Sequence, residues 1–137
     1  MTKFLRYTLL VLAVLSVGIN TMARTPGSKV GVSFDMTEVD FGNVSESVGS
    51  VHVEYVMTNT SDGAVAILSA RASCGCTKPK YPKKPVMPGD SAVIEVDFAT
   101  TGQHGEISKE VTLRLRNASG KGEKLQLVLR GVVLPDN

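Results

Sequence analysis

The sequence predicts an all-β fold, an antiparallel β-sandwich of about seven strands, and three observations predict it. Apolar and polar residues alternate with a period of two along most of the chain, as strands with one buried face require. Clusters of glycine, proline, asparagine and aspartate separate the alternating runs, and such residues mark turns. After the first 23 residues, no stretch shows the apolar period of 3.6 residues that is typical of a helix.

The alternation places each expected strand in turn. The strands lie near residues 32–34, 38–41, 51–58, 64–72, 92–98, 107–116 and 124–133. The side chains expected to face the core are Val51, Val53, Tyr55, Met57, Ala92, Ile94, Val96, Phe98, Val111, Leu113, Leu115, Leu125, Leu127 and Leu129. Turns are expected at residues 59–63, 87–90, 101–105 and 117–122. Short strands separated by turns at this spacing are typical of a β-sandwich.

The first 23 residues predict a secretory signal peptide. Lys3 and Arg6 precede an apolar run at residues 8–19, and Thr21 with Ala23 forms a small-x-small cleavage site. The run is shorter than the about 20 apolar residues that a spanning helix needs, and no cysteine follows it for lipid attachment. We therefore expect an exported protein, periplasmic or secreted and not lipid-anchored, that meets the membrane only during export.

The expected organisation is a signal peptide at residues 1–23, a flexible leader at 24–30 and one β-sandwich domain at 31–137. Cleavage after Ala23 removes Lys3 and Arg6, which lowers the 15 basic residues to 13 and equals the 13 acidic ones. A neutral domain lacks the basic character of nucleic-acid-binding proteins, so we expect no nucleic-acid partner. A domain of this size buries roughly two-thirds of its surface on folding and can fold without disulfides.

The sequence offers few parts of an active site, so we predict no enzymatic activity and no cofactor. Catalysis would need a nucleophile, a base and an orienting group in one place. His52 falls on the polar face of its strand and His104 falls in a turn, so both are expected at the surface. Glu95 and Asp97 share one outward face, which is usually the solvated side of a sheet. No glycine-rich phosphate loop is present.

Cys74 and Cys76, with Gly75 between them, are the only cysteines, and they form the possible disulfide or thiol site. Residues two apart on a strand share a face, and a glycine can bend the backbone enough to join the sulfurs. Such a small ring would add little stability, and we expect a disulfide there to be strained and reducible. The favoured interpretation is a tight turn with a local disulfide or two buried thiols.

Two alternatives for this cysteine pair stay open. Two thiolates suit a soft metal ion such as Cu(I) or Zn(II), but a tetrahedral site needs four ligands, and Met57, Met87 and His104 would have to come together to complete it. Thiol–disulfide exchange would be favoured by the lysines and by Arg71 nearby. The cysteine pair, however, lacks the helix N-terminus that tunes the thiol pKa of CxxC oxidoreductases.

The lysine-proline segment, residues 78–89, carries four lysines and four prolines. One interpretation is a solvated crossover between the sheets. The other is a partner-docking loop for an acidic envelope protein or a glycan, made by Lys78, Lys80, Tyr81, Lys83 and Lys84. Three short glycosylation signals also occur, and such matches are common by chance: Asn59-Thr60-Ser61, Asn117-Ala118-Ser119 and Asp90-Ser91-Ala92.

Taken together, five segments resemble the bacterial exported family catalogued as domain of unknown function 1573. The segments are VDFGNV, YVMTNTSDGAVAI, SCGCTKPKYPKKPVMPGD, IEVDFATTGQHGEISKEVTLRLRN and LVLRGVV. Their most specific residues are Phe41, Gly42, Asn59, Cys74 to Thr77, Pro88, Gly89, Gly105, Lys109 and Gly131.

The resemblance implies an immunoglobulin-like sandwich of the Hydin type with a CGCT motif, located in the cell envelope. It leaves the biochemical role unassigned. We therefore expect a non-enzymatic envelope module that binds a partner or serves a structural role, through its sheet edges or the lysine-proline segment. The alternative is a thiol-based redox or soft-metal protein that uses Cys74 and Cys76.

Overall fold

The computed structural model describes residues 27–136, so the predicted signal peptide and its cleavage site lie outside the described residues. This part of the chain contains eight strands and one short 3-10 helix, η1. Their bounds are β1 Val32–Phe34, β2 Glu38–Ser45, η1 Glu46–Val48, β3 Ser50–Asn59, β4 Val65–Ala72, β5 Thr77–Lys80, β6 Ser91–Ala99, β7 Gly105–Asn117 and β8 Gly122–Leu134. Among residues 27–136, no helix has the length and apolar character needed to cross a membrane.

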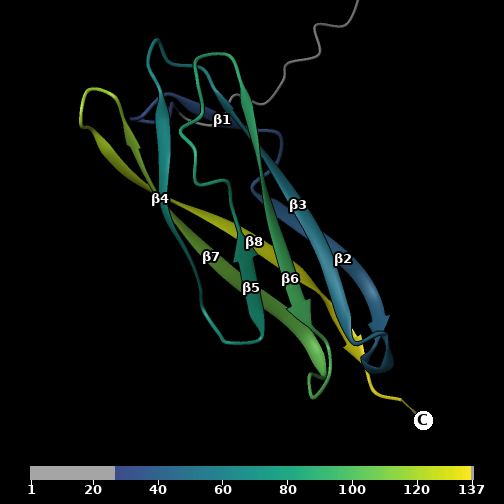
Figure 1. Ribbon diagram of the computed structural model, residues 1–137. Helices are drawn as coiled ribbons and strands as arrows, with labels where there is room; N and C mark the ends of the chain where they lie inside the picture. The colour runs from purple at the N-terminus through teal and green to yellow at the C-terminus, as the bar shows by residue number, and fades with distance from the viewer. Residues whose placement is uncertain (1–26, 137) are drawn as a thin grey trace, which may run out of the picture.

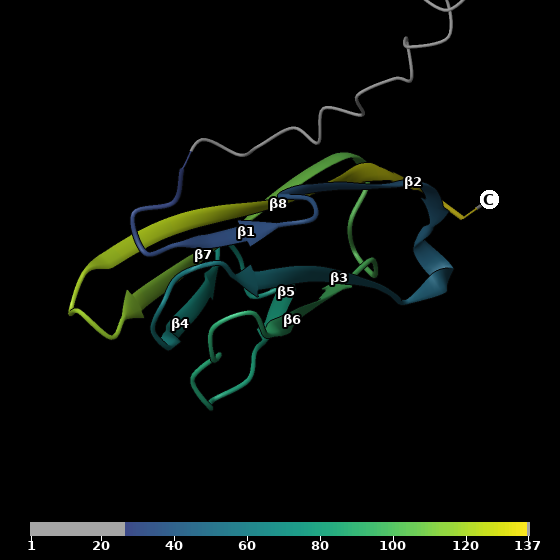
Figure 2. The same ribbon diagram turned by 90° about the horizontal axis from the view of Figure 1, so that it is seen from above.

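The strands form two four-stranded sheets that pack face to face (Figures 1 and 2). The first sheet has the order β1-β3-β6-β5, and the second has the order β2-β8-β7-β4. All neighbours are antiparallel except β2 and β8, which run parallel. The chain changes sheet between β1 and β2, so the first strand of the sandwich is divided between the two sheets. The prediction of an all-β sandwich is confirmed.

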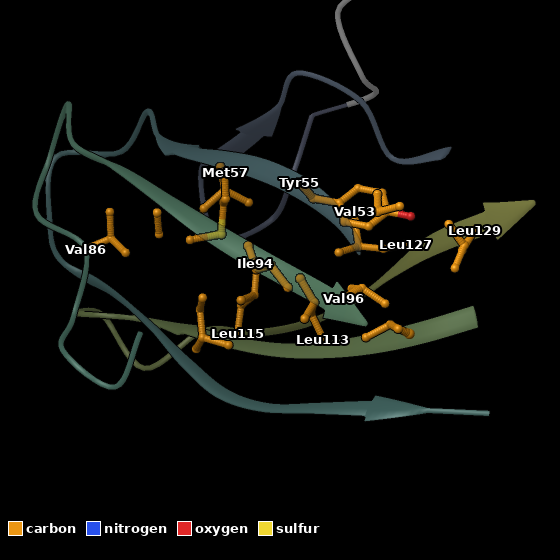
Figure 3. Packing of buried hydrophobic residues seen from close by; sticks show 14 of the residues in the cluster. Val53, Tyr55, Met57, Val86, Ile94, Val96, Leu113, Leu115, Leu127 and Leu129 are labelled. Atoms are coloured by element: carbon orange, nitrogen blue, oxygen red, sulfur yellow. The ribbon is translucent and has the colours of Figure 1, made fainter. Parts of the chain in front are cut away.

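The core lies between the sheets and contains the side chains that the alternation predicted (Figure 3). All of them are buried except Val51 and Leu125, which are half-buried. Met57 is fully buried, which confirms that it packs in the core. Tyr55 keeps its hydroxyl satisfied, since Oη donates to the carbonyl of Val128 at 2.7 Å. Period-two alternation therefore identified the inward faces correctly, because it depends only on strand geometry.

The structure differs from the expected elements at two places. Strand β5 was expected as loop because of its proline content, yet Thr77–Lys80 pairs with β6. Pro79 is tolerated there because β5 is an edge strand, and a proline without an N–H disturbs only a central strand. The core also extends into the expected leader, since Val30 is 1% exposed. Ser28 ties this segment to β8 through a hydrogen bond of 2.6 Å to Glu123.

Phe41 and Gly131 are sterically complementary, because the ring of Phe41 fills the space beside Gly131. The ring of Phe41 stacks on Phe98 with centroids 5.9 Å apart, and it lies where Gly131 has no side chain. A Cβ on Gly131 would stand 2.3 Å from the ring. Gly42, which follows Phe41, has a φ of 72° and lies where the register of β2 with β8 shifts between Asp40 and Asn43. Glycine adopts that backbone conformation without steric cost.

Candidate functional site

The two cysteines are joined, with the Cys74 and Cys76 sulfurs 1.99 Å apart and their Cα atoms 5.3 Å apart. They lie in the turn where the chain crosses from β4 in the second sheet to β5 in the first. The turn is bonded to both sheets. The Ser73 N–H donates to the carbonyl of Glu110 on β7 (2.9 Å), and the Ala99 N–H at the end of β6 donates to the carbonyl of Cys76 (2.8 Å).

The sulfur pair is half-buried and close to one hydroxyl group. Cys76 packs against the hydrophobic core, and Thr77, which is 3% exposed, places Oγ1 at 3.4 Å from the Cys74 sulfur and 3.9 Å from the Cys76 sulfur. A bonded sulfur is not a thiolate, and only the thiolate is a metal ligand or a nucleophile. Metal binding by the pair therefore requires prior reduction, whereas thiol–disulfide exchange can begin with attack of an external thiolate on this disulfide. Both alternatives stay predictions.

The ligands considered for a soft-metal site lie in three different surroundings. Met57 is fully buried in the core, and Met87 is 55% exposed in the loop between β5 and β6. His104 lies in the turn between β6 and β7, where its Nδ1 is 3.6 Å from a carboxylate oxygen of Glu46.

The lysine-proline segment begins on β5 and continues as the loop that leads to β6. Lys78 and Lys80 lie on the strand, opposite Asp97 and Glu95 of β6. The loop then passes beside β4 (Figure 1), where the backbones of Val65 and Val86 exchange two hydrogen bonds of 2.9 and 2.8 Å. The segment is thus held between the two sheets at its middle.

Asn59, at the end of β3, anchors the same loop and is fully buried. Its Nδ2 donates to the carbonyls of Gly63 and Val86, both at 2.8 Å. Its Oδ1 accepts from the backbone N–H (2.9 Å) and the hydroxyl (2.7 Å) of Ser61. Its own backbone N–H donates to the carbonyl of Asp90 (2.9 Å). The sequence marked Asn59 as a glycosylation signal, but its amide nitrogen is buried and already donates twice.

A partly apolar surface lies beside this loop. Leu68 of β4 is 45% exposed and Val93 of β6 is 41% exposed. Tyr81 lies beside Val93, since both line an open hollow of about 430 Å³, and its Oη donates to the backbone carbonyl of Leu68 at 3.4 Å. The Leu68 side chain itself lines another hollow, with Arg114, Arg116 and Lys124 of the second sheet. The ammonium of Lys83 lies 3.6 Å from the centre of the Tyr81 ring. We call Tyr81, Val93 and Lys83 the Tyr81 surface.

The lysines near this surface differ in their partners. Lys80 forms an ion pair of 2.9 Å with Asp97. Lys78, Lys83 and Lys84 have no ion-pair partner among residues 27–136. The hydrogen bond with His52, which has the larger effect, and the hydrogen bond from Lys80 lower the pKa of the Asp97 carboxyl. Lys78 and Lys84 therefore keep their charge for an external partner, and the ammonium of Lys83 lies over the Tyr81 ring.

Sequence reasoning named the lysines and Tyr81 of this region but not Leu68, Val93 or the role of Asn59. Leu68 and Val93 are exposed because Leu68 falls at a register shift in β4 and Val93 points outward from β6. An asparagine at a strand end followed by Thr-Ser-Asp-Gly is a signal for a side-chain-stabilised turn, and it could have identified Asn59.

Strands A, B, E and D of an immunoglobulin-like sandwich form one sheet and C, F and G form the other, and the observed strand orders match this class. The chain belongs to the family described as Protein of unknown function (DUF1573), whose sequence profile matches residues 32–133. This confirms the resemblance recognised in the sequence. No curated protein matches the sequence.

Solved structures share the fold at low sequence identity. The ASH/PapD-like domain 7 of human CEP192 has a TM-score of 0.63 at 10% identity, over 90% of this chain and 99% of that one. The VesB protease of Vibrio cholerae has a TM-score of 0.62 at 15% identity, over 74% of this chain and 31% of that one. The periplasmic chaperone SfaE has a TM-score of 0.58 at 16% identity, over 78% and 58%. This chain therefore spans under a third of VesB, and these likenesses show the fold alone.

Proposed function

We propose that this protein is a non-enzymatic binding module of the cell envelope that docks an acidic segment of another protein on the Tyr81 surface. The single observation that carries the proposal is the combination of exposed Val93 with Tyr81 and the lysines next to it. An apolar centre with a polar rim is the usual composition of a protein interface. Charges of one sign around this apolar centre select partners that carry the opposite charge.

The edge strands of both sheets are poorly suited to pairing with an added strand from a partner. Strand β1 has three residues, and β5 has four with Pro79 among them. Strands β2 and β4 both carry a register shift, and β4 is also met by the loop at Val86. Short strands, prolines and bulges are the devices that block edge pairing. The side-chain surface is therefore the better docking site.

Rigidity also supports the proposal. Asn59 and the Val65–Val86 pair hold the loop in one conformation, so binding would cost little of the ordering entropy that flexible loops lose. The fold neighbours include a chaperone named as periplasmic, which fits an envelope location. The apolar N-terminal run and the absence of catalytic parts in the sequence support export and a non-enzymatic role.

Site-specific photo-crosslinking in cells tests the proposal. A photoreactive residue at position 93 should capture a partner whose crosslinked segment is acidic, and Lys83→Glu with Lys84→Glu should abolish the capture. The matched controls are the same probe at Met36, which is 47% exposed elsewhere, and Lys121→Glu in the exposed turn between β7 and β8. Equal capture from positions 36 and 93, or capture unaffected by the charge reversals, would contradict the proposal. Cell fractionation that finds the protein only in the cytoplasm would contradict the envelope location.

A further inference from the structure

The outer face of the first sheet carries a cluster of charged side chains on neighbouring strands. His52 and Glu54 are two residues apart on β3, so they share a face. In the register of β3 with β6, His52 lies opposite Asp97 and Glu54 lies opposite Glu95. Glu95 and Asp97 are paired with strands on both sides, β3 and β5, whereas His52 and Glu54 are paired with β6 alone, because β1 meets β3 only at Met57 to Asn59. All four residues therefore lie on paired strands.

The carboxylates in this cluster exceed the cations that could neutralise them. Glu54 and Glu95 are directly opposed, and like charges in that position destabilise a sheet. Lys80 of β5 lies opposite Glu95 in the register, but its ammonium pairs with Asp97 instead. Among residues 27–136, no lysine or arginine lies within ion-pair distance of Glu54 or Glu95. Two negative charges thus face each other without a lysine or arginine between them.

His52 is oriented as a metal-binding histidine usually is. Its Nδ1 lies 2.7 Å from Oδ1 of Asp97, and Lys80 holds the other oxygen of that carboxylate at 2.9 Å. With the proton on Nδ1, the lone pair of Nε2 is free, and Nε2 lies 3.5 Å from Oε1 of Glu54. A carboxylate behind the histidine fixes the tautomer and the ring orientation in metal sites.

The spacing of the three donor atoms suits a small divalent ion. One ligand atom each from His52, Glu54 and Glu95 lies within 4.8 Å of the others. Bonds of 2.0–2.2 Å to a tetrahedral zinc ion put ligand atoms about 3.4 Å apart, so His52 and Glu54 already have this separation. The carboxylate of Glu95 lies within 4.8 Å of both and has to move closer to complete the set. Imidazole nitrogen with two carboxylate oxygens is a donor set that zinc accepts, with water as the fourth ligand.

We propose that His52, Glu54 and Glu95 bind a divalent transition-metal ion of the zinc type, with Asp97 and Lys80 as positioning residues. The two carboxylates balance the charge of the ion, and neutral His52 supplies the nitrogen ligand. This site differs from the soft-metal alternative at Cys74 and Cys76, because its ligand atoms are nitrogen and oxygen instead of sulfur. It adjoins the Tyr81 surface, because Glu95 and Lys80 also line the hollow beside Tyr81 and Val93, but the bound ion needs no protein partner.

Isothermal titration of the purified oxidised protein with zinc chloride tests the site. We expect one saturable site, lost in His52→Ala and weakened at least tenfold in Glu95→Gln. Asp97→Asn should weaken binding by about 10–100-fold, as removal of such supporting carboxylates does. The control is His104→Ala, which removes the other imidazole that faces a carboxylate, at Glu46, and should leave the affinity unchanged. All four side chains are on the surface or half-buried, and circular dichroism confirms that each variant is folded.

Nuclear magnetic resonance supplies the second readout. Zinc should shift the imidazole signals of His52 and leave those of His104 in place. Absence of saturable binding up to about 1 mM zinc, retention of binding in His52→Ala, or loss of binding in His104→Ala would each overturn the proposal. Failure of the crosslinking experiment would leave this result unaffected, so the two proposals are tested separately.

Discussion

Replacement of Asn59 by alanine is the most informative perturbation of this fold, because one buried side chain connects the end of β3 to two loops. The substitution removes the donors to Gly63 and Val86 and the acceptor for Ser61. Two of these partners keep another hydrogen bond, since the Val86 carbonyl also accepts from the Val65 N–H (2.9 Å) and the Gly63 carbonyl accepts from the Ser61 hydroxyl (2.8 Å). Only the N–H of Ser61 loses its one acceptor.

The expected cost of Asn59→Ala follows from this inventory. An orphaned buried group costs about 1–3 kcal/mol, and each further hydrogen bond lost costs about 0.5–1.5 kcal/mol net. Together they lower the free energy of unfolding by about 3 kcal/mol, which is a large share of the about 5–15 kcal/mol of an ordinary domain. Urea denaturation followed by far-ultraviolet circular dichroism measures the change, because the chain has no tryptophan.

The matched control is Asn117→Ala. Its Oδ1 accepts from the Lys121 N–H and the Ser119 hydroxyl in the exposed turn after β7, where water replaces the lost bonds, so the cost should stay below about 1 kcal/mol. Trypsin cleavage after Lys80 or Lys83 should accelerate in the Asn59 variant and not in the control. Equal costs for the two variants, with unchanged cleavage, would refute the role assigned to Asn59.

Three further predictions follow from other parts of the structure. Gly131→Ala should lower the free energy of unfolding by about 1–3 kcal/mol, because the new Cβ meets the ring of Phe41. The control is Gly122→Ala, on the same strand and likewise without a positive φ, where the new Cβ lies 3.6 Å from the Leu115 carbonyl oxygen; equal losses would contradict the steric reason. Burial, which is the larger effect, and the charge of Glu38 raise the pKa of Tyr55 to about 12, so the contribution of this phenol to stability is present below pH 10 and is lost between pH 10 and 12. Because the chain has three tyrosines, the ultraviolet titration is compared with that of Tyr55→Phe: the substitution should remove a step near 12, and removal of a step near 10 instead would contradict the burial. Replacement of both cysteines by serine should lower the free energy of unfolding by less than about 2 kcal/mol, because closing a three-residue loop removes little chain entropy. A melting curve that shows an unfolded variant would contradict this. Alkylation with and without reductant counts the joined sulfurs in the purified protein.

Most of the fold could be predicted from the sequence, because strand alternation is a local property. Tyr55, Phe98 and Leu113 face the core as their positions in alternating runs require. Strand β5 could not be found in this way, since Pro79 argues against a strand until its place at an edge is known. The number of strands was therefore expected to be about seven and is eight among residues 27–136.

The candidate surfaces were predicted only in part. The lysines and Tyr81 stood out by composition, but Leu68 and Val93 looked like ordinary strand residues. His52, Glu54 and Glu95 appeared as separate surface residues, because residues 54 and 95 meet only when β3 and β6 pair in one particular register. Register is a long-range property that hydrophobic packing selects, and no local pattern in the sequence contains it.

The sequence alone thus determined the class of fold, the inward faces of the strands and the resemblance to a family, all of which depend on residues near one another in the chain. The tertiary structure decided which distant residues meet. It placed Asn59 under the lysine-proline segment and brought Glu95 opposite Glu54 beside His52. These arrangements arise from strand order and register, which form only when the two sheets close over a common core.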